Sequence, residues 1–469
     1  MSNSVPQPVQ PDVRSGRLGS AEYAKAFADA QPRLTRAQSL LESERCLYCF
    51  DAPCTQACPT GIDVPSFIKR IADDNLRGAA RTILDANPLG GMCARVCPTE
   101  NLCEGVCVRN TQEGKPVAIG RLQRHAVDAL IESNRPQLFS RAPATGKTVA
   151  VVGSGPAGLA CAYTLARDGH NVVIFDARPK AGGLNEYGLA SYKTPNQYAQ
   201  AEVQWLLGIG GITVRNDWRL ETVNQLAALR NEFDAVFLGM GLSSTHSLGI
   251  PGETLTGVRD AVDFIAELRQ SSDLSTLPVG RRVVVIGGGM TAVDAAVQAK
   301  LLGAESVHMV YRRGAADLSA SIAEQEWAQT NGVTIALWLA PLELVPTLDC
   351  ASPGPGSSGH VCAVRFAHQA MVNGKLCATG ETTVMQADMV LKAIGQQLGN
   401  PMLRDAGLKL DGGRIATDAA GQTNLEGVWA GGDCRAGGLD LTVEAVAHGK
   451  QSANAIHAFL GGINSAAVA

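Results

Sequence analysis

Residues 148–158 read Thr-Val-Ala-Val-Val-Gly-Ser-Gly-Pro-Ala-Gly, and this stretch decides the fold class. The run of small and β-branched residues before Gly153 predicts a short buried strand, and the glycines predict a tight turn into a helix. Such glycines let the backbone approach a pyrophosphate, which the N-terminus of the helix then holds. The nucleotide contacts expected in this stretch are Gly153, Gly155, Pro156, Ala157 and Gly158.

Residues 282–292 repeat this pattern as Arg-Val-Val-Val-Ile-Gly-Gly-Gly-Met-Thr-Ala, but the strand that follows ends differently. After the first copy, the next strand ends at Asp176, whose carboxylate is placed to accept hydrogen bonds from ribose hydroxyls. After the second copy, the strand ends at Tyr311, and Arg312 and Arg313 follow. Guanidinium groups suit a 2′-phosphate, so we expect NADPH at this site, with NADH as the alternative if both arginines are merely solvated. The residues expected here are Gly287, Gly289, Thr291, Ala292, Arg312 and Arg313.

Residues 423–433 read Thr-Asn-Leu-Glu-Gly-Val-Trp-Ala-Gly-Gly-Asp and resemble the second FAD motif of flavoproteins with two dinucleotide sites. A helix is expected from Thr442, and its N-terminus would face the flavin, where the helix dipole favours negative charge on a reduced ring. The FAD-binding domain is therefore expected to be split, with the nicotinamide-binding domain inserted between its halves. The further residues expected to contact the cofactors are Asp176, Gly183, Gly395, Gly432, Asp433 and Thr442.

Eight of the thirteen cysteines lie within the first 107 residues, in two groups of four. The groups are Cys46, Cys49, Cys54 and Cys58, then Cys93, Cys97, Cys103 and Cys107. A proline follows both Cys58 and Cys97, as in cysteine runs that bind iron–sulfur clusters. Eight soft thiolates are enough for two 4Fe-4S clusters. The alternatives are a structural zinc begun by Cys46 and Cys49, or disulfides, which suit short secreted chains better than this long one without an apolar leader.

Length and composition restrict the classes of protein to consider. The 469 residues leave room for about three domains. A net charge of −4 provides no basic field that would attract nucleic acid or an acidic membrane. No run of about 18 apolar residues is present in the sequence, so no transmembrane helix is expected. Clustered reducible thiols and the lack of a signal peptide indicate a cytoplasmic protein.

Apolar residues recur at helical spacing in the N-terminal part, and a strand–turn–helix pattern follows. We therefore expect an α/β fold with an all-α N-terminal iron–sulfur domain and two Rossmann-like nucleotide-binding domains, the second inserted in the first. The expected divisions are a disordered tail at 1–20, a helical domain with two 4Fe-4S clusters at 21–145, an FAD-binding part at 146–250, an NAD(P)H-binding domain at 251–390 and a second FAD-binding part at 391–469.

From Cys46 to its C-terminus, the chain resembles the family that contains the glutamate synthase small subunit and the N-terminal half of dihydropyrimidine dehydrogenase. Residues 93–103 and 119–124 are most similar to the electron-input subunit of the bacterial dehydrogenase. The resemblance implies a hydrogen bond from Asp433 to the ribityl chain of FAD. It also implies one cluster on Cys46, Cys49, Cys54 and Cys107, and another on Cys58, Cys97, Cys103 and Gln123. Cys93 is then without iron; the rival interpretation has two all-thiolate clusters and leaves Gln123 on the helix surface.

The resemblance implies an NAD(P)H-dependent oxidoreductase subunit with FAD and two 4Fe-4S clusters. Electrons would pass from the nicotinamide through FAD and the clusters to an FMN-containing large subunit that reduces uracil and thymine. No catalytic acid or base is then required on this chain. A glutamate synthase large subunit or a ferredoxin is the alternative acceptor. A redox-sensing protein with structural clusters is the alternative from a different class.

Overall fold

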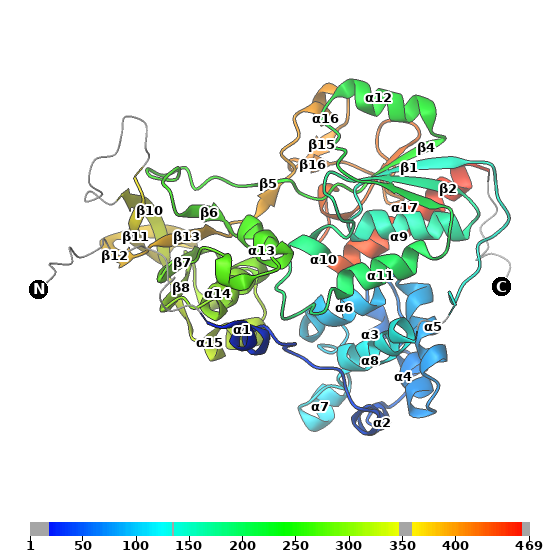
Figure 1. Ribbon diagram of the computed structural model, residues 1–469, viewed down its shortest axis with the longest axis horizontal. Coiled ribbons are helices and arrows are strands. Elements are labelled where there is room, and N and C mark those ends of the chain that lie inside the picture. Colours follow the sequence, from blue (N-terminus) through cyan, green and yellow to red (C-terminus); the bar gives the residue numbers. More distant parts are fainter. Residues whose placement is uncertain (1–17, 134–135, 347–358, 462–469) are drawn as a thin grey trace, which may run out of the picture. The chain divides into compact units, whose positions relative to one another are not determined.

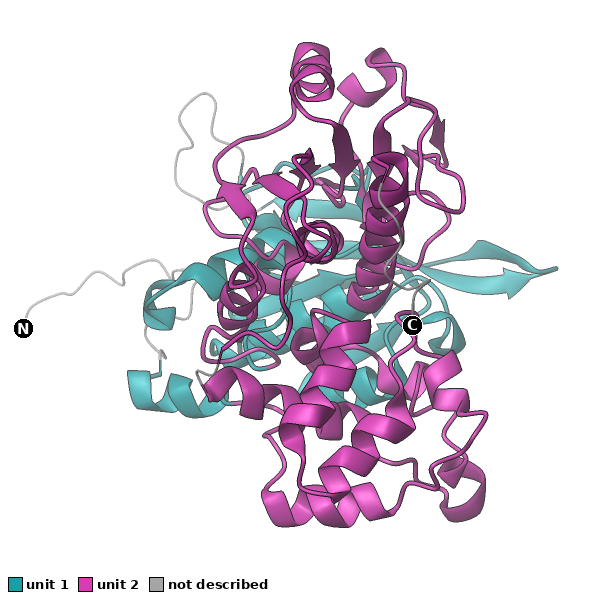
Figure 2. Ribbon diagram, turned by 90° about the vertical axis from the view of Figure 1, so that its right-hand side faces the viewer, with its two compact units in different colours: residues 1–28, 187–192, 245–396 teal, residues 29–186, 193–244, 397–469 magenta. Residues whose placement is uncertain are grey.

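The computed structural model describes residues 18–133, 136–346 and 359–461. The chain divides into two compact units (Figure 2). The main unit comprises residues 29–186, 193–244 and 397–469, and the inserted unit comprises residues 1–28, 187–192 and 245–396. The tail expected at 1–20 lies outside the described residues up to residue 17. Helix α1 (Ser20–Ala26) begins at the last residue of the expected tail.

The main unit begins with a block of short helices, blue to cyan in Figure 1. Helix α4 shows how the sequence forms them: Asp63 caps its N-terminus by accepting a hydrogen bond from Ser66 N at 3.1 Å. The apolar residues of α4 that recur at helical spacing are all buried, and they are Val64, Phe67, Ile68 and Ile71. The helices are α2 (Arg36–Glu44), α3 (Pro53–Gln56), α4 (Val64–Ala72), α5 (Leu76–Ala86), α6 (Gly90–Val96), α7 (Arg109–Glu113) and α8 (Ile119–Glu132).

The rest of the main unit is built on a five-stranded parallel sheet with the strand order β17-β4-β1-β2-β3. Its strands are β1 (Thr148–Val152), β2 (Asn171–Phe175), β3 (Ile212–Arg215), β4 (Ala235–Leu238) and β17 (Val428–Ala430). Strand β17 comes from the C-terminal part of the chain, yet it pairs in parallel with β4, with Ala430 opposite Leu238. The sheet thus confirms that this domain is split.

Two helices pack closely beside this sheet, α9 (Pro156–Arg167) and α17 (Thr442–Phe459) (Figure 1). Gly449 permits the approach, because a Cβ there would lie 2.1 Å from the carbonyl oxygen of Ala157. The other elements of the unit are α10 (Leu184–Tyr187), α11 (Tyr198–Leu207), α12 (Val223–Glu232), α16 (Met402–Asp405), β15 (Leu410–Asp411) and β16 (Arg414–Ile415). Strands β5 (Ser244–Thr245) and β14 (Gln396–Gln397) lie where the chain passes between the units.

The inserted unit contains a second five-stranded parallel sheet, with the strand order β6-β13-β7-β8-β9. Its elements are β6 (Val258–Asp260), α13 (Ala261–Gln270), β7 (Arg282–Ile286), α14 (Met290–Leu301), β8 (Ser306–Tyr311), α15 (Ile322–Thr330), β9 (Val333–Leu337) and β13 (Met389–Lys392). Three antiparallel strands, β10 (Leu339–Pro346), β11 (Val361–Val372) and β12 (Lys375–Gln386), come between β9 and β13. The expected fold class is confirmed, and this antiparallel sheet is an addition that the sequence motifs did not predict.

Helix α1 and residues 187–192 belong to the inserted unit, whereas the expected boundaries place them in the cluster domain and in the FAD-binding part. Polar contacts with α14 explain both differences. The Tyr23 hydroxyl donates to the carbonyl of Leu302, the C-cap of α14, at 3.1 Å. The buried carboxylate of Asp294 accepts a hydrogen bond from Ala190 N at 3.0 Å.

One hydrophobic core runs through both parts of the main unit. It includes Phe67 and Leu122 from the helical block, Val151 from β1 and Val446 from α17. The helical block and the split α/β part therefore fold against each other as one body.

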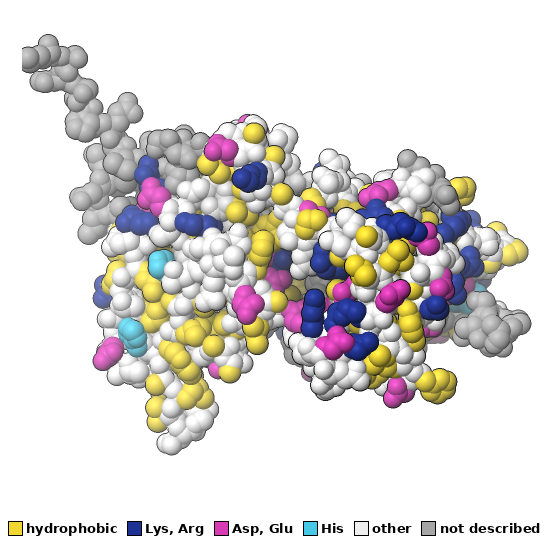
Figure 3. All heavy atoms as spheres, turned by 90° about the horizontal axis from the view of Figure 1, so that it is seen from below, with side chains coloured by type: hydrophobic (Ala, Val, Ile, Leu, Met, Phe, Trp, Pro, Cys, Tyr) yellow, Lys and Arg dark blue, Asp and Glu magenta, His cyan; other side chains and the backbone are white. Residues whose placement is uncertain are grey.

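The face of the molecule in Figure 3 carries hydrophobic, basic and acidic side chains interspersed with one another. This face therefore has no extended field of one sign, in keeping with the net charge of −4. Among the described residues, no helix combines the length and the apolar character needed to cross a lipid bilayer.

Candidate redox sites

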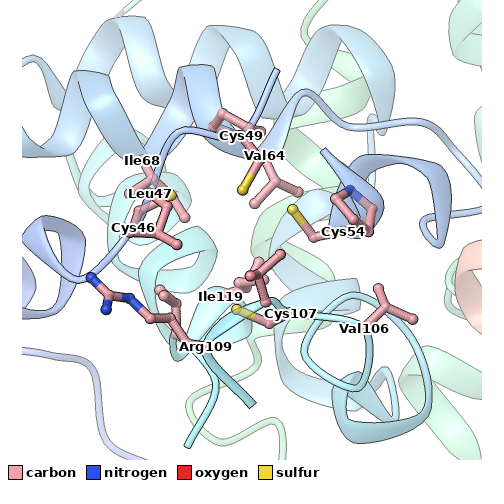
Figure 4. Close-up of a pocket in the computed structure, with 14 residues that line it drawn as sticks. Cys46, Leu47, Cys49, Cys54, Val64, Ile68, Val106, Cys107, Arg109 and Ile119 are labelled. Carbon is pink, nitrogen blue, oxygen red and sulfur yellow. The ribbon is translucent and has the colours of Figure 1, made fainter. Parts of the chain in front are cut away.

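Four of the N-terminal cysteines line one pocket of the helical block (Figure 4). Cys46 and Cys49 lie in the loop between α2 and α3, Cys54 in the first turn of α3, and Cys107 before α7. The sulfur atoms of Cys49, Cys54 and Cys107 point toward the middle of the pocket. Apolar side chains complete the lining, among them Leu47, Val64, Ile68, Val106 and Ile119. The structure thus brings together the four cysteines that the resemblance groups as one ligand set.

The loop that bears the first three of these cysteines has an unusual backbone. Tyr48 and Ala52 have φ angles of +51° and +27°, in a region that residues with side chains seldom adopt. Both residues lie between cysteines of the pocket, and Pro53 then starts α3. Such a conformation persists only where its surroundings fix it. Here it turns successive thiols toward one pocket.

The spacing of the thiols bears on the zinc alternative. Among the residues that the structure describes, no three His, Cys, Asp or Glu side chains come close enough together to hold one metal ion. A zinc ion draws four ligands to within about 2.0–2.3 Å, whereas each thiolate of a 4Fe-4S cluster binds a different iron atom. The four thiols of the pocket are ligands that both kinds of metal site accept. The eight N-terminal cysteines are also free thiols, which gives the disulfide alternative no support.

Burial favours the protonated form of three of these thiols, Cys46, Cys54 and Cys103. It raises the pKa of Cys54 to about 11, and the neighbouring Cys46 thiol adds to the shift. The pKa values of Cys46 and Cys103 are raised as well, again mainly by burial. Because iron binds the thiolate, the assembly of a cluster here releases protons.

A second group of thiols surrounds Cys97, which follows the last residue of α6. A hydrogen bond to Cys93, burial, and the nearby thiols of Cys103 and Cys58 all raise the pKa of Cys97. Cys93 therefore lies with this group. Gln123 is buried in α8, and its Nε2 donates to the first carbonyl group of α6 at 2.7 Å. Both candidates for the eighth cluster ligand thus lie on α6 or in contact with it.

Two glycines of the turn after β1, Gly153 and Gly158, leave no room for a Cβ. Gly153 has a φ of +100°, and a Cβ there would lie 2.4 Å from the carbonyl oxygen of Gly239. A Cβ at Gly158 would lie 1.9 Å from the carbonyl oxygen of Gly153, so this glycine sets the distance between α9 and the turn. Pro156 starts α9 directly behind the turn. The N-terminus of α9 is thereby available to an anion such as a pyrophosphate.

Asp176, at the end of β2, fixes this turn. Its carboxylate accepts hydrogen bonds from Ser154 N at 2.7 Å and from Arg178 N at 2.8 Å, and the Ser154 hydroxyl also donates to it. Gly183 approaches the same turn, because a Cβ on it would lie 2.6 Å from the Cα of Gly155. A carboxylate has about four acceptor positions, so Asp176 retains capacity for a ribose hydroxyl. The ribose contact itself stays a prediction.

The C-terminal motif meets the first glycine turn. Gly432 has a φ of +71°, and a Cβ there would lie 3.0 Å from the Cβ of Ala157. Burial raises the pKa of the adjacent Asp433 to about 6, and the Asp440 carboxylate adds to the shift. Thr442 starts α17. The residues expected to bind FAD from both halves of the chain therefore gather at the carboxyl ends of the parallel strands, where such sheets bind ligands.

The second glycine turn, between β7 and α14, is similarly tight. A Cβ at Gly287 would lie 2.2 Å from the carbonyl oxygen of Ala393, and one at Gly288 would lie 2.6 Å from the Tyr311 ring. The sequence prediction did not include Gly288, although the unbroken run of three glycines is a signal that points to it. The other predicted residues are Gly289, which caps α14, Thr291 and Ala292 in its first turn, and Gly395, two residues beyond Ala393.

Arg312 and Arg313 directly follow β8, and both are exposed. Neither has an ion-pair partner within the described ranges of the chain. Their guanidinium groups are therefore free to bind an anion, as the predicted NADPH site requires. The preference for NADPH over NADH stays a prediction.

Two protein families match the two parts of the chain. Residues 23–135 match the family described as dihydropyrimidine dehydrogenase domain II, 4Fe-4S cluster. Residues 147–343 and 360–449 match the pyridine nucleotide-disulphide oxidoreductases. The first match covers the helical block with its two thiol groups, and the second covers both glycine turns.

Relatives cover almost the whole chain. It is 33% identical over 429 residues to the NAD-dependent dihydropyrimidine dehydrogenase subunit PreT of Salmonella typhimurium, covering 92% of this chain and 96% of that one. It is 31% identical over 473 residues to the glutamate synthase (NADPH) small chain of Escherichia coli, covering 96% of each. Mycobacterium tuberculosis FprA in complex with NADPH shares the fold, with a TM-score of 0.55 and 20% identity over 68% of this chain and 85% of that one. The chain therefore belongs to the pyridine nucleotide-disulphide oxidoreductases, carries an N-terminal domain of the 4Fe-4S family, and is related to PreT and to the glutamate synthase small chains.

Proposed function

We propose that this protein is the electron-input subunit of a dihydropyrimidine dehydrogenase. It takes electrons from NAD(P)H and passes them through FAD and two 4Fe-4S clusters to an FMN-containing large subunit that reduces uracil and thymine. When bound, FAD supplies the exchange between a two-electron hydride and single electrons. One observation above all supports the proposal: both thiol groups and the FAD-type glycine turn belong to one compact unit with one core.

The residues of this chain bind and orient the cofactors. The glycine turn and the N-terminus of α9 hold the pyrophosphate of FAD, while Asp176 accepts hydrogen bonds from its ribose. Asp433 hydrogen-bonds the ribityl chain, and the N-terminus of α17 stabilises negative charge on the reduced ring. Arg312 and Arg313 bind the 2′-phosphate of NADPH. The proposed electron transfer requires no general acid or base from this chain.

Two sets of four residues bind the clusters. One set is Cys46, Cys49, Cys54 and Cys107, and the other is Cys58, Cys97, Cys103 and Gln123. Gln123 is favoured over Cys93 because its Nε2 is already engaged with a backbone carbonyl, which leaves Oε1 as the ligating atom. Free thiols of this kind persist in a reducing compartment, and we place the protein in the cytoplasm for that reason.

The relatives indicate two candidate partners. PreT of Salmonella typhimurium and of Escherichia coli is named a dihydropyrimidine dehydrogenase subunit, and residues 23–135 match a domain described from that enzyme. This favours a pyrimidine-reducing partner. In the described part of the chain, each five-stranded parallel sheet already has its own nucleotide turn, so we assign FMN to the partner. The glutamate synthase small chain supports the second candidate, a glutamate synthase large subunit.

Reconstitution with purified partners tests this proposal. Alone and under anaerobic conditions, the protein should pass electrons from NAD(P)H to artificial acceptors but leave uracil unchanged. With the cognate FMN-containing subunit, it should support the reversible reduction of uracil to dihydrouracil. Uracil reduction by the isolated chain would contradict the assignment of this reaction to the partner subunit. Activity with a glutamate synthase large subunit only would select the second candidate.

A further inference from the structure

Helix α6 is held by a buried carboxylate from the α/β part of the main unit. Glu202 of α11 is fully buried; its Oε1 accepts hydrogen bonds from Gly91 N at 2.8 Å and from Met92 N at 3.1 Å, and Met92 N also lies 3.3 Å from Oε2. N–H groups in the first turn of a helix have no acceptor within that helix. Glu202 thus provides, from 110 residues away in sequence, the acceptors that the first turn of α6 requires.

The contact depends on close packing between α6 and α11. Gly91 permits it, because a Cβ there would lie 1.9 Å from the Tyr198 hydroxyl oxygen. Arg95 lies over the Tyr198 ring at 3.3 Å from its centroid, and it donates to both carboxylate oxygens of Asp128 at 2.8 and 2.9 Å. Asp128 belongs to α8, the helix of Gln123. Helix α6 is therefore fixed between α11 and α8.

The carbonyl group of Gly90, next to the two capped N–H groups, sets the orientation of Gln123. The Gln123 Nε2 donates to this carbonyl at 2.7 Å. A carbonyl can only accept a hydrogen bond, so it selects the NH2 end of the side-chain amide and turns Oε1 the other way. Oε1 is the atom through which this amide could bind iron. A shift of the first turn of α6 would move the group that orients it.

We propose that Glu202 is a positioning residue for the second cluster: it fixes the first turn of α6 so that the Gly90 carbonyl presents Oε1 of Gln123 to iron. This inference rests on the proposed ligation by Gln123. The hydrogen bonds thus link the α/β part, through Glu202 and the first turn of α6, to the proposed cluster ligand Gln123. Residues that orient metal ligands in this way commonly affect metal affinity or activity by roughly ten- to a hundred-fold when they are replaced.

Electron paramagnetic resonance (EPR) spectra of the reduced holoprotein test the inference. Gln123→Ala should change the signal of one cluster, and Glu202→Leu should change the signal of that same cluster. Glu202→Gln should restore most of the wild-type signal, because its Oε1 keeps the two shorter hydrogen bonds, while the amide NH2 replaces the Oε2 atom that accepts from Met92 N at 3.3 Å. NAD(P)H should reduce FAD at a near wild-type rate in all three variants. Electron transfer to the partner should slow roughly ten- to a hundred-fold in Glu202→Leu.

Matched variants separate this role from a general loss of structure. Glu253 in the inserted unit also accepts hydrogen bonds from two backbone N–H groups, of Leu248 and Gly249, so Glu253→Leu should leave both cluster signals unchanged. If Glu202→Leu fails to fold, Glu202→Asp withdraws the carboxylate by one methylene and should give a smaller change in the same signal. A double variant that combines Glu202→Leu with Gln123→Ala should give the same EPR signals as Gln123→Ala alone, since Glu202 acts through Gln123.

The outcomes distinguish the inference from the function on which it rests. A Gln123→Ala protein with two wild-type signals would overturn the glutamine ligation and this inference with it. A changed signal in Gln123→Ala, together with wild-type signals in Glu202→Leu or Glu202→Asp, would overturn the positioning role alone. A change in both clusters of the Glu202 variants would also overturn it.

Discussion

We expect the choice between the two nicotinamide cofactors to depend on Arg312 and Arg313. Both side chains are exposed after β8 and free of ion pairs in the described part of the chain. Replacing both with alanine should raise the KM for NADPH more than the KM for NADH, because only NADPH has a 2′-phosphate. The binding free energy lost for NADPH should be about 1.5–3 kcal/mol, which raises its KM roughly ten- to a hundred-fold. Steady-state kinetics with both cofactors measures it, and a wild-type preference for NADH would show that the arginines are ordinary surface charges.

Asp433 gives the FAD-free protein a pH dependence of definite sign. Burial raises its pKa from 3.8 to about 6, so the folded state binds more protons than the unfolded state between these values. The free energy of unfolding should therefore fall as the pH rises through this window, by up to about 3 kcal/mol. Asp433→Asn should remove this dependence, and urea unfolding of both proteins between pH 4 and pH 7 compares them. A difference between the two proteins that is constant from pH 4 to pH 6 would contradict the buried carboxyl.

At the scale of elements, the approach of α17 to α9 brings together the two halves of the candidate FAD site. Gly449→Ala places a Cβ 2.1 Å from the carbonyl oxygen of Ala157, so α17 has to move away. The free energy of unfolding should decrease by about 1–3 kcal/mol, and the amount of FAD bound per chain should decrease. Asn454→Ala, at an exposed position of the same helix, is the control and should change neither. Full FAD content and wild-type stability in Gly449→Ala would contradict this packing.

Elements with a local sequence signal could be predicted, and elements that depend on tertiary contacts could not. The glycine turns were predictable because a Cβ at certain positions would collide with the backbone, as the contacts of Gly153 and Gly287 show. The split of the FAD-binding domain was predictable from the C-terminal Gly-Asp motif, and the structure realises it by pairing β17 with β4. The place of α1 depends on a hydrogen bond between Tyr23 and Leu302, 279 residues apart, and no local pattern reveals it.

The same distinction holds for the sites of the whole molecule. The spacing of the cysteines indicated clusters, and the resemblance grouped the four that share a pocket, Cys107 included. The position of Glu202 at α6 could not be predicted, because in sequence it is one glutamate in a helix. Contacts between helices of different parts of the main unit decide its environment. The sequence thus predicts which residue types can bind the cofactors, but it does not predict the helix packing that positions them.

The central claim is that one chain holds FAD and two 4Fe-4S clusters in electronic contact. Anaerobic purification followed by titration with NADPH tests it directly, with flavin absorbance and cluster EPR signals recorded together. We predict one FAD, about eight iron atoms and about eight sulfides per chain, with NADPH reducing both FAD and the clusters. Cys46→Ser should lose one cluster and keep its FAD. Flavin without labile sulfide, stoichiometric zinc, or clusters that stay oxidised while FAD is reduced would contradict the account.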